Sequence, residues 1–343
     1  SVNKHTFYNL DIEEGLIGGA SYDKFKLPIT DQVLEKAKNV DAVILGAVGG
    51  PKYDSLPFKL KPERGLLKLR KELDLYANIR PAKAFNALKE ASSLKSEIIK
   101  GMDIIVLREL TGGIYFGEPR GIEDLDDGQR RGINTEVYTT NEIVRLAKVG
   151  FEIAMERKGL VHSVEKANVM ESGILWREEV KKLHETKFSN ITLLNMYADN
   201  CAMQLVKNPS QFDVIITGNL FGDILSDISA ELTGSLGMLP SASLGERIND
   251  RRKALYEPVH GSAPDIAGKN IANPIAMIMS FSMMLEHSFY DQKTSKVIEK
   301  SVENVLENGF RTKDICQDDT KEVSTSDMGE LICEEFKSLS KNI

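Results

Sequence analysis

Two aspartates four residues apart, Asp223 and Asp227, have the residue type and spacing to bind a metal ion. They follow a short β-branched run, Phe212–Ile216, which predicts a buried strand that Gly218 and Asn219 end. Residues four apart share one face of a helix, so these two carboxylates would repel each other by roughly a few tenths of a kcal/mol. Mg²⁺ or Mn²⁺ would relieve that repulsion, because both ions prefer oxygen ligands. A solvated acidic helix face is an equally good interpretation of this stretch alone.

Three arginines, Arg70, Arg80 and Arg108, could hold the carboxylates of an acidic substrate. A guanidinium presents a planar fork of donors that matches a carboxylate. Each of these arginines, taken singly, is more often part of a surface ion pair. Together with the aspartate pair, they indicate a site for a multiply charged acid that is bound through a metal ion.

Four further residues lie where strands or glycine-rich loops are expected to end. Tyr115, on the loop 111–117, could donate a proton, although an aromatic packing residue is the common alternative. Lys166 could act as a base or be an ordinary lysine with a buried stem. Asp199 could be a third metal ligand or cap the next helix. His260 begins a turn whose amides could receive a pyrophosphate, and a structural histidine is an equal alternative.

Apolar runs and amphipathic runs alternate along the chain and predict the elements that position these residues. Strands are expected at residues 41–45, 76–81, 103–108, 161–166, 191–197, 212–217 and 254–258. Helices are expected at about 30–39, 65–74, 141–157, 172–184, 199–207, 274–287, 292–308 and 326–339, and a helical pattern also follows Asn219. Residues 240–245 should form a loop, and residues 260–265 a turn that leads into a short helix. The alternation predicts an α/β fold with a largely parallel sheet, which binds ligands at its strand ends.

Composition narrows the class of protein. A length of 343 residues allows two domains or one large one, and 41% hydrophobic with 28% charged residues is typical of a globular protein. The net charge of −7 argues against nucleic acid as a partner. Three scattered cysteines fit a reducing compartment. The longest apolar stretch, Ile275–Leu285, is too short to span a membrane and no signal peptide is visible, so a cytoplasmic location is expected.

Four stretches resemble the isocitrate/isopropylmalate family of β-decarboxylating dehydrogenases. They are Arg108–Gly117, Val164–Asn168, Thr217–Asp227, and Glu257–Asp265 with Asn273–Pro274. The resemblance implies a two-domain α/β sandwich and not a standard Rossmann fold; the turn Gly46–Pro51 accordingly lacks the GxGxxG spacing. It implies a discontinuous cofactor-binding domain at residues 1–75 and 235–343, and a substrate, metal and dimerisation domain at residues 76–234. Family members usually open with a strand and a glycine-rich loop, and this sequence begins after them.

The resemblance also implies a reaction, the metal-dependent and NAD-linked oxidation of a 2-hydroxy acid at C2 followed by loss of its β-carboxylate as CO₂. Substrate carboxylates would be held by Arg70, Arg80 and Arg108, and Mg²⁺ or Mn²⁺ by Asp223, Asp227 and, from a second subunit, Asp199. Lys166, from that same second subunit, would take the hydroxyl proton, and Tyr115 would help protonate the enolate carbon. These crossing contributions imply a homodimer.

The cofactor and the substrate side chain would contact other segments. NAD would rest on His260, Gly261, Ser262, Ala263, Pro264 and Asp265, with Asn273 near the adenine. A carboxylate at Asp265 suits ribose hydroxyls and would repel a 2′-phosphate, which predicts NAD and not NADP. Leu66, Leu67 and Val169 would line an apolar pocket for an isopropyl group, with Glu63 nearby. The expected substrate is therefore (2R,3S)-3-isopropylmalate, which would give 4-methyl-2-oxopentanoate and CO₂ in leucine biosynthesis.

Alternative functions remain open at this point. Isocitrate, homoisocitrate or tartrate could be the substrate, because an apolar pocket discriminates by only about 1–3 kcal/mol per methylene. A non-catalytic regulatory subunit of the family would be expected to lack Tyr115, Lys166 or an aspartate, and all are present. A metal-dependent phosphotransferase would need a phosphate-binding loop or a nucleophile motif, and neither is found.

Overall fold

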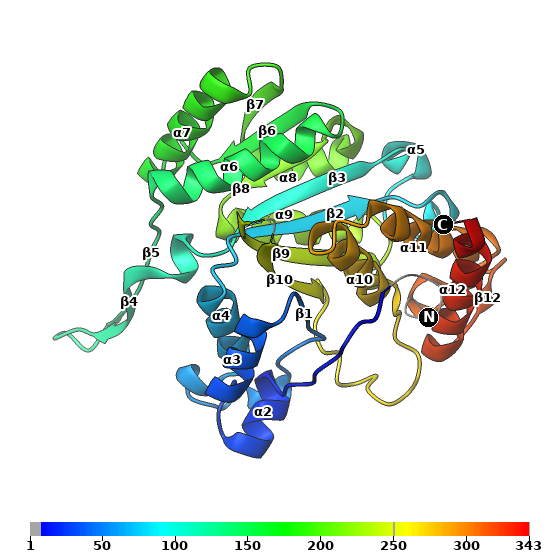
Figure 1. Cartoon of the computed structure of the whole chain (residues 1–343). Coiled ribbons are helices and arrows are strands. Elements are labelled where there is room, and N and C mark those ends of the chain that lie inside the picture. Colours follow the sequence, from blue (N-terminus) through cyan, green and yellow to red (C-terminus); the bar gives the residue numbers. More distant parts are fainter. Residues whose placement is uncertain (1–7, 250, 343) are drawn as a thin grey trace. The chain divides into compact units, whose positions relative to one another are not determined.

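The computed structural model describes residues 8–249 and 251–342, which divide into two compact units (Figure 1). Unit 1 holds the described residues within Ser1–Leu75, Ala84–Ser96 and Ala230–Ile343, and unit 2 holds Tyr76–Lys83 and Glu97–Ser229. Both units combine strands with helices. The predicted α/β class is thereby confirmed.

Unit 2 contains five neighbouring strands in the order β2–β3–β8–β6–β7. Their bounds are β2 Ala77–Lys83, β3 Asp103–Glu109, β8 Val214–Thr217, β6 Leu160–Glu165 and β7 Thr192–Tyr197. β2 runs antiparallel to β3, whereas β3–β8, β8–β6 and β6–β7 are parallel pairs. The carboxyl ends of β3, β8 and β6 therefore lie at one edge of this unit.

Helices cover both faces of these strands. α6 (Thr140–Met155) and α7 (Glu171–Lys187) lie on one face, and α8 (Ala198–Lys207) and α9 (Asn219–Glu231) lie on the other (Figure 1). α6 begins at a reciprocal cap between Thr139 and Glu142. It then buries Ile143, Leu146 and Phe151 completely, each of which contributes about 1.5–3 kcal/mol. A short helix, α5 (Ser96–Ile99), precedes β3.

A hairpin of β4 (Gly117–Asp124) and β5 (Arg130–Thr135) projects from unit 2 (Figure 1). Sequence analysis did not predict it. Most of its side chains are exposed, including the apolar Ile122. A lone two-stranded hairpin is only marginally stable in water, so a surface that packs against it would stabilise it.

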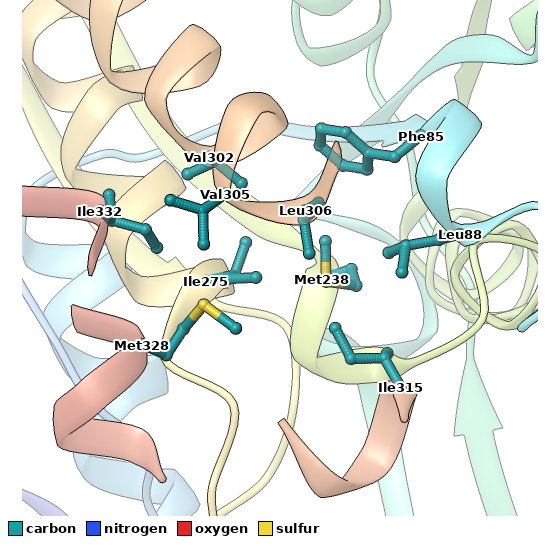
Figure 2. Packing of buried hydrophobic residues seen from close by; sticks show 10 residues of the cluster. All are labelled: Phe85, Leu88, Met238, Ile275, Val302, Val305, Leu306, Ile315, Met328 and Ile332. Atoms are coloured by element: carbon teal, nitrogen blue, oxygen red, sulfur yellow. The ribbon is translucent and has the colours of Figure 1, made fainter. Parts of the chain in front are cut away.

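In unit 1, β1 (Val43–Ile44) pairs in parallel with β10 (Arg251–Pro258), which pairs antiparallel with β9 (Pro240–Ile248). Three long helices follow: α10 Ile275–His287, α11 Gln292–Glu307 and α12 Thr325–Leu339. Figure 2 shows the core that they form, in which Ile275 of α10 lies near Val305 of α11 and Met328 of α12. Met238, Phe85 and Leu88 join this cluster from other segments of the unit.

Unit 1 also contains α2 Gly18–Phe25, α3 Asp31–Asn39 and α4 Glu63–Glu72. α3 and α4 pack on a second cluster, which joins Leu34 and Leu69 to Leu255 of β10. Thr30 caps α3 as predicted, because its hydroxyl accepts from the Val33 amide. β11 (Phe310–Arg311) pairs with β12 (Lys321–Glu322). Short 3₁₀ helices lie at Pro51–Tyr53, Phe58–Leu60, Asn86–Leu88, Gly113–Tyr115, Pro209–Gln211, Leu236–Met238, Lys313–Ile315 and Ser340–Asn342.

Three expectations about unit 1 were wrong. Residues 240–245 are not a loop but part of β9, and the serines of this strand are buried. The Ser241 hydroxyl donates to the Glu257 carbonyl, and the Ser241 amide donates to the Ser280 hydroxyl of α10. The buried strand expected at 41–45 is only β1, and its Ile44 is 44% exposed. No helix follows residues 260–265, which form bends and turns. For β9, the neighbouring strand β10 and helix α10 override the loop-like local composition.

Candidate active site

Two arginines converge on one aspartate in unit 2. Arg80 pairs with Val106 across β2 and β3, so Arg80 and Arg108 point to the same face of the sheet. The Arg80 Nη1 lies 3.3 Å from Asp223 Oδ1, and Arg108 Nη1 forms an ion pair with the same oxygen. The two guanidinium side chains are only 8% and 6% exposed. Buried cations of this kind require a charged partner, which Asp223 provides.

Asp223 reaches the arginines because α9 starts directly after β8, the strand beside β3. Gly222 allows the close approach, since a Cβ there would lie 2.6 Å from the Arg108 Cγ. One turn further on, Asp227 Oδ1 lies 3.5 Å from Arg80 Nη1. Asp223 and Asp227 thus share the helix face that their spacing predicts.

Tyr115 lies beside the same aspartate. Its hydroxyl donates to Asp223 Oδ2 at 3.3 Å, and the Arg108 guanidinium lies 5.7 Å from its ring centre. Arg120 donates to the Tyr115 carbonyl and holds the loop. Burial, and then the charge of Asp223, raise the pKa of the Tyr115 phenol. Tyr115 is therefore held as a neutral phenol whose O–H donates to Asp223.

The pair of carboxylates fits a divalent cation. Burial, assisted by the charge of Asp223, raises the pKa of Asp227 even though Arg80 and Arg108 oppose the shift. A cation between the two carboxylates would remove the repulsion that contributes to this shift, and oxygen ligands are those that Mg²⁺ and Mn²⁺ prefer. Over the described part of the chain, no three His, Cys, Asp or Glu side chains gather into a metal-binding group. One chain therefore brings together two of the three expected ligands.

Asp199, the third expected ligand, lies elsewhere in unit 2. Its Oδ1 is 2.7 Å from the Nζ of Lys166, and the hydrogen bond from this lysine lowers the pKa of Asp199. Glu165, which is buried, accepts from the Ala167 amide and pairs with Arg177. Lys166 and Asp199 therefore form a separate pair next to the end of β6. Their assignment to the metal site of a second subunit stays a prediction.

Asparagine and serine side chains complete the arginine site, and sequence analysis did not assign them to it. Asn219 Oδ1 accepts from Arg108 Nε at 3.0 Å and Nη2 at 2.8 Å. Asn78 Oδ1 accepts from Arg80 Nε at 2.8 Å, and Ser226 Oγ accepts from Arg80 Nη1 at 2.7 Å. The position of Asn219 at the break between β8 and α9 could have indicated from the sequence that it belongs to the site. For Asn78, the only such indication is that it lies two residues before Arg80 on the same face of β2.

The remaining expected substrate residues lie on other elements. Arg70, on α4 of unit 1, forms an ion pair with Glu257 of β10. Leu66 and Leu67 of α4 are half-buried, and Glu63 at the start of that helix is exposed. Val169 of unit 2 is 69% exposed. Their contacts with a substrate remain predictions.

The expected cofactor loop belongs to unit 1 and lies beside a second glycine-rich turn. The Ser262 hydroxyl donates to the Gly49 carbonyl at 3.1 Å. Residues 261–265 are exposed, and Ala263 adopts a left-handed φ of 39°. Exposed amides on two adjoining turns fit a phosphate-containing ligand. Asn273 accepts from the Ile275 amide and donates to Asp314, which fixes the start of α10, and its place near the adenine stays a prediction.

The chain belongs to the isocitrate/isopropylmalate dehydrogenase family, whose model matches residues 1–332. This confirms the family resemblance and makes the protein an oxidoreductase. Curated relatives named 3-isopropylmalate dehydrogenase include that of Pelagibacter ubique, 59% identical over 332 residues, covering 96% of this chain and 90% of that protein. That of Rhodospirillum rubrum is 58% identical with the same two coverages.

Solved structures agree on the fold. An isocitrate dehydrogenase from Methylococcus capsulatus aligns with a TM-score of 0.85 at 32% identity, covering 98% of this chain and 93% of that chain. A β-decarboxylating dehydrogenase from Thermococcus kodakarensis aligns with a TM-score of 0.77 at 31% identity, covering 99% of this chain and 91% of that chain. Among the described residues, no helix is long and apolar enough to cross a membrane.

Proposed function

We propose that this protein catalyses the NAD-dependent oxidative decarboxylation of (2R,3S)-3-isopropylmalate to 4-methyl-2-oxopentanoate and CO₂, in leucine biosynthesis. The observation that carries the proposal is the joint contact of Arg80, Arg108 and Tyr115 with Asp223, one helical turn from Asp227. This arrangement provides cations for carboxylates, oxygens for a metal ion and a proton donor within one site. The relatives named 3-isopropylmalate dehydrogenase support the choice of substrate.

The protein uses NAD and a divalent metal, Mg²⁺ or Mn²⁺. Asp223 and Asp227 would hold the metal, and the exposed loop 261–265 would hold NAD. When bound, the metal would supply a Lewis acid for the C2 oxygen and for the negative charge left by loss of CO₂, and NAD would supply the hydride acceptor.

The residues of the chain bind the substrate and move its protons. Arg80 and Arg108 are buried, so their attraction for the two malate carboxylates is less screened by water than at a surface. Lys166 takes the proton of the C2 hydroxyl as hydride leaves C2. After the C3–carboxylate bond breaks, Tyr115 gives its phenolic proton to C3. Leu66 and Leu67 would contact the isopropyl group, where the isocitrate enzymes are expected to have polar residues.

A homodimer completes the site in this proposal. Lys166 and Asp199 contact each other within one chain, so both would enter the site of the partner together. Apolar side chains exposed on unit 2 support a partner surface there; they are Ile174, Leu194, Met203, Val206 and Ile224. Most side chains of the projecting hairpin β4–β5 are exposed, so they are also available to a partner. We place this dimer in the cytoplasm, where its three free cysteines would remain reduced.

A mixing experiment tests the crossed site. Neither the Lys166→Ala protein nor the Asp223→Asn protein should form NADH from 3-isopropylmalate. When the two are unfolded together and refolded, half of the dimers are hybrids in which one of the two sites is intact. Roughly a quarter of wild-type activity should return. If both residues act within one chain, every site carries one defect and the mixture stays inactive.

A substrate panel tests the acid itself. Isocitrate, homoisocitrate and tartrate should each give a lower kcat/KM than 3-isopropylmalate with NAD, and NADP should replace NAD poorly. A preference for isocitrate would contradict the proposed substrate, and turnover retained in Lys166→Ala would contradict the proposed base.

A further inference from the structure

Tyr138 lies between two segments that the proposed reaction uses, although the reaction assigns it no role. It directly precedes the cap of α6. Its hydroxyl accepts a hydrogen bond from the backbone amide of Asn219 at 2.6 Å, at the first residue of α9. The Trp176 ring packs against the Tyr138 ring nearly edge-on, at a centre-to-centre distance of 5.4 Å. The phenol is therefore fixed against the start of the helix that carries both aspartates.

Two glycines show how closely the neighbouring loops approach Tyr138. A Cβ on Gly113 would lie 2.3 Å from the Tyr138 hydroxyl oxygen, and Gly113 has a φ of +71° that disfavours other residues. A Cβ on Gly218 would lie 2.9 Å from the same oxygen. Gly113 belongs to the turn that carries Tyr115, and Gly218 precedes α9. Both turns are thus shaped around one hydroxyl group.

Asn219 extends this contact to the arginine site. Its side-chain amide donates to the Gly112 carbonyl at 3.1 Å, while its Oδ1 accepts both hydrogen bonds from Arg108. Arg108 in turn pairs with Asp223. A shift of the Asn219 backbone would therefore move the orientation of Arg108 and the position of Asp223 relative to the Tyr115 loop. Tyr138 holds that backbone through its hydroxyl.

We propose that Tyr138 is a positioning residue that sets α9 in register with the Tyr115 loop, so that Arg108, Asp223 and Tyr115 meet in the geometry needed to bind metal and substrate. The inference rests on the proposed function for its substrate, but its metal-binding consequence can be measured without turnover. Groups that orient metal ligands typically change metal affinity or activity by about 10–100-fold when removed.

The test compares two conservative variants. Tyr138→Phe removes the hydroxyl and keeps the ring. Tyr256→Phe is the matched control, because Tyr256 is a fully buried tyrosine of unit 1 whose hydroxyl bonds with the Ser288 hydroxyl at 2.7 Å. Both variants lose one hydrogen bond of a tyrosine. Only the first is expected to change the metal site.

Three quantities separate positioning from general stability. Tyr138→Phe should weaken Mn²⁺ binding, measured by electron paramagnetic resonance of the free ion, by about 10-fold, and should raise the KM for 3-isopropylmalate. Its KM for NAD should stay at the wild-type value, because the expected NAD loop belongs to unit 1. Tyr256→Phe should lower Tm alone. A role in stability only would predict wild-type Mn²⁺ affinity and KM values in both variants, and that result would overturn the proposal.

A second variant covers the case in which Tyr138→Phe does not fold. Gly218→Ala places a methyl group against the Tyr138 hydroxyl without removing it, so it should weaken Mn²⁺ binding in the same direction. Unchanged Mn²⁺ binding in Gly218→Ala would also overturn the proposal. If the wild-type protein fails to oxidise 3-isopropylmalate, the proposed function fails, but the Mn²⁺ comparison still decides the role of Tyr138.

Discussion

Asp227→Asn should stabilise the metal-free protein while it weakens metal binding. Burial and the charge of Asp223 raise the pKa of Asp227, so the folded protein disfavours its ionised form despite the nearby Arg80 and Arg108. The Asp227 side chain is 59% exposed, and water screens much of this effect. We therefore expect the amide to increase the free energy of unfolding by about 0.3–0.5 kcal/mol at neutral pH. In a protein of 343 residues, that raises Tm by roughly 0.5 °C.

Metal should reverse the order of stability. A ligand at 100 times its Kd stabilises the folded state by about 2.7 kcal/mol. If losing one carboxylate ligand weakens binding about 100-fold, the same concentration stabilises the variant by only about 0.4 kcal/mol. Wild type should therefore unfold at a lower temperature than Asp227→Asn in EDTA, and at a higher temperature than Asp227→Asn in saturating Mn²⁺. Differential scanning calorimetry in the two buffers measures both transitions.

Asp223→Asn is the matched comparison on the same helix face. Asp223 is the ion-pair partner of the buried Arg80 and Arg108, so its loss should destabilise the metal-free protein by about 1–3 kcal/mol. Both variants should lose most of the protection by Mn²⁺. The reasoning is refuted if Asp227→Asn is destabilised in EDTA like Asp223→Asn, or if it keeps full protection by Mn²⁺.

Two further predictions concern packing and pH. Gly222→Ala should push Arg108 from its position, raise the KM for the acid about 10-fold and lower the free energy of unfolding by about 1–3 kcal/mol. The control is Gly329→Ala on α12, where an added methyl group has open space, and it should stabilise the protein slightly. Kinetics and Tm of the two variants check this, and equal effects would contradict it. Burial lowers the pKa of His162 in the folded protein to about 4, whereas its pKa in the unfolded chain is near 6.5. Folding therefore competes with protonation of His162 below pH 6.5, and the free energy of unfolding falls as the pH is lowered from 6.5 towards 4. Measured by urea unfolding, the free energy of unfolding of wild type should fall by about 2 kcal/mol more between pH 7 and pH 5 than that of His162→Leu. Equal decreases in the two proteins would contradict the lowered pKa of His162.

The aspartate pair and two of its arginines could be predicted because they depend on local rules. Spacing along a helix places Asp223 and Asp227 on one face, and alternation along a strand sets the face of Arg80 and Arg108. The order β2–β3–β8 then brings these strands together with the helix that follows β8. The first two steps use only sequence distance within an element, and strand ends were expected to gather at one edge, whereas the strand order itself comes from the structure.

The neighbours that hold these charged groups could not be predicted in the same way. Asn219 contacts Arg108, Gly112 and Tyr138, which are separated from it by 111, 107 and 81 positions in the sequence. The periodicity of residues within a single helix or strand cannot predict contacts between residues so far apart in the sequence. The strand β9 was missed for a related reason, because its serines look like a loop until α10 covers them. Local patterns thus identify the groups that carry charge, whereas tertiary packing selects the groups that orient them.

The charges of the site explain why cations and carboxylates lie together before any ligand binds. The formal charges of Arg80 and Arg108 balance those of Asp223 and Asp227. A divalent metal and a doubly charged malate core also balance each other, so the site is formally neutral both with and without its ligands. Asp223 matters most to this balance, because losing the direct partner of the buried Arg80 and Arg108 would cost about 1–3 kcal/mol, whereas the exposed Asp227 contributes little. With a metal held by the two aspartates, the arginines could pair with substrate carboxylates in their place without a change in the formal charge of the site.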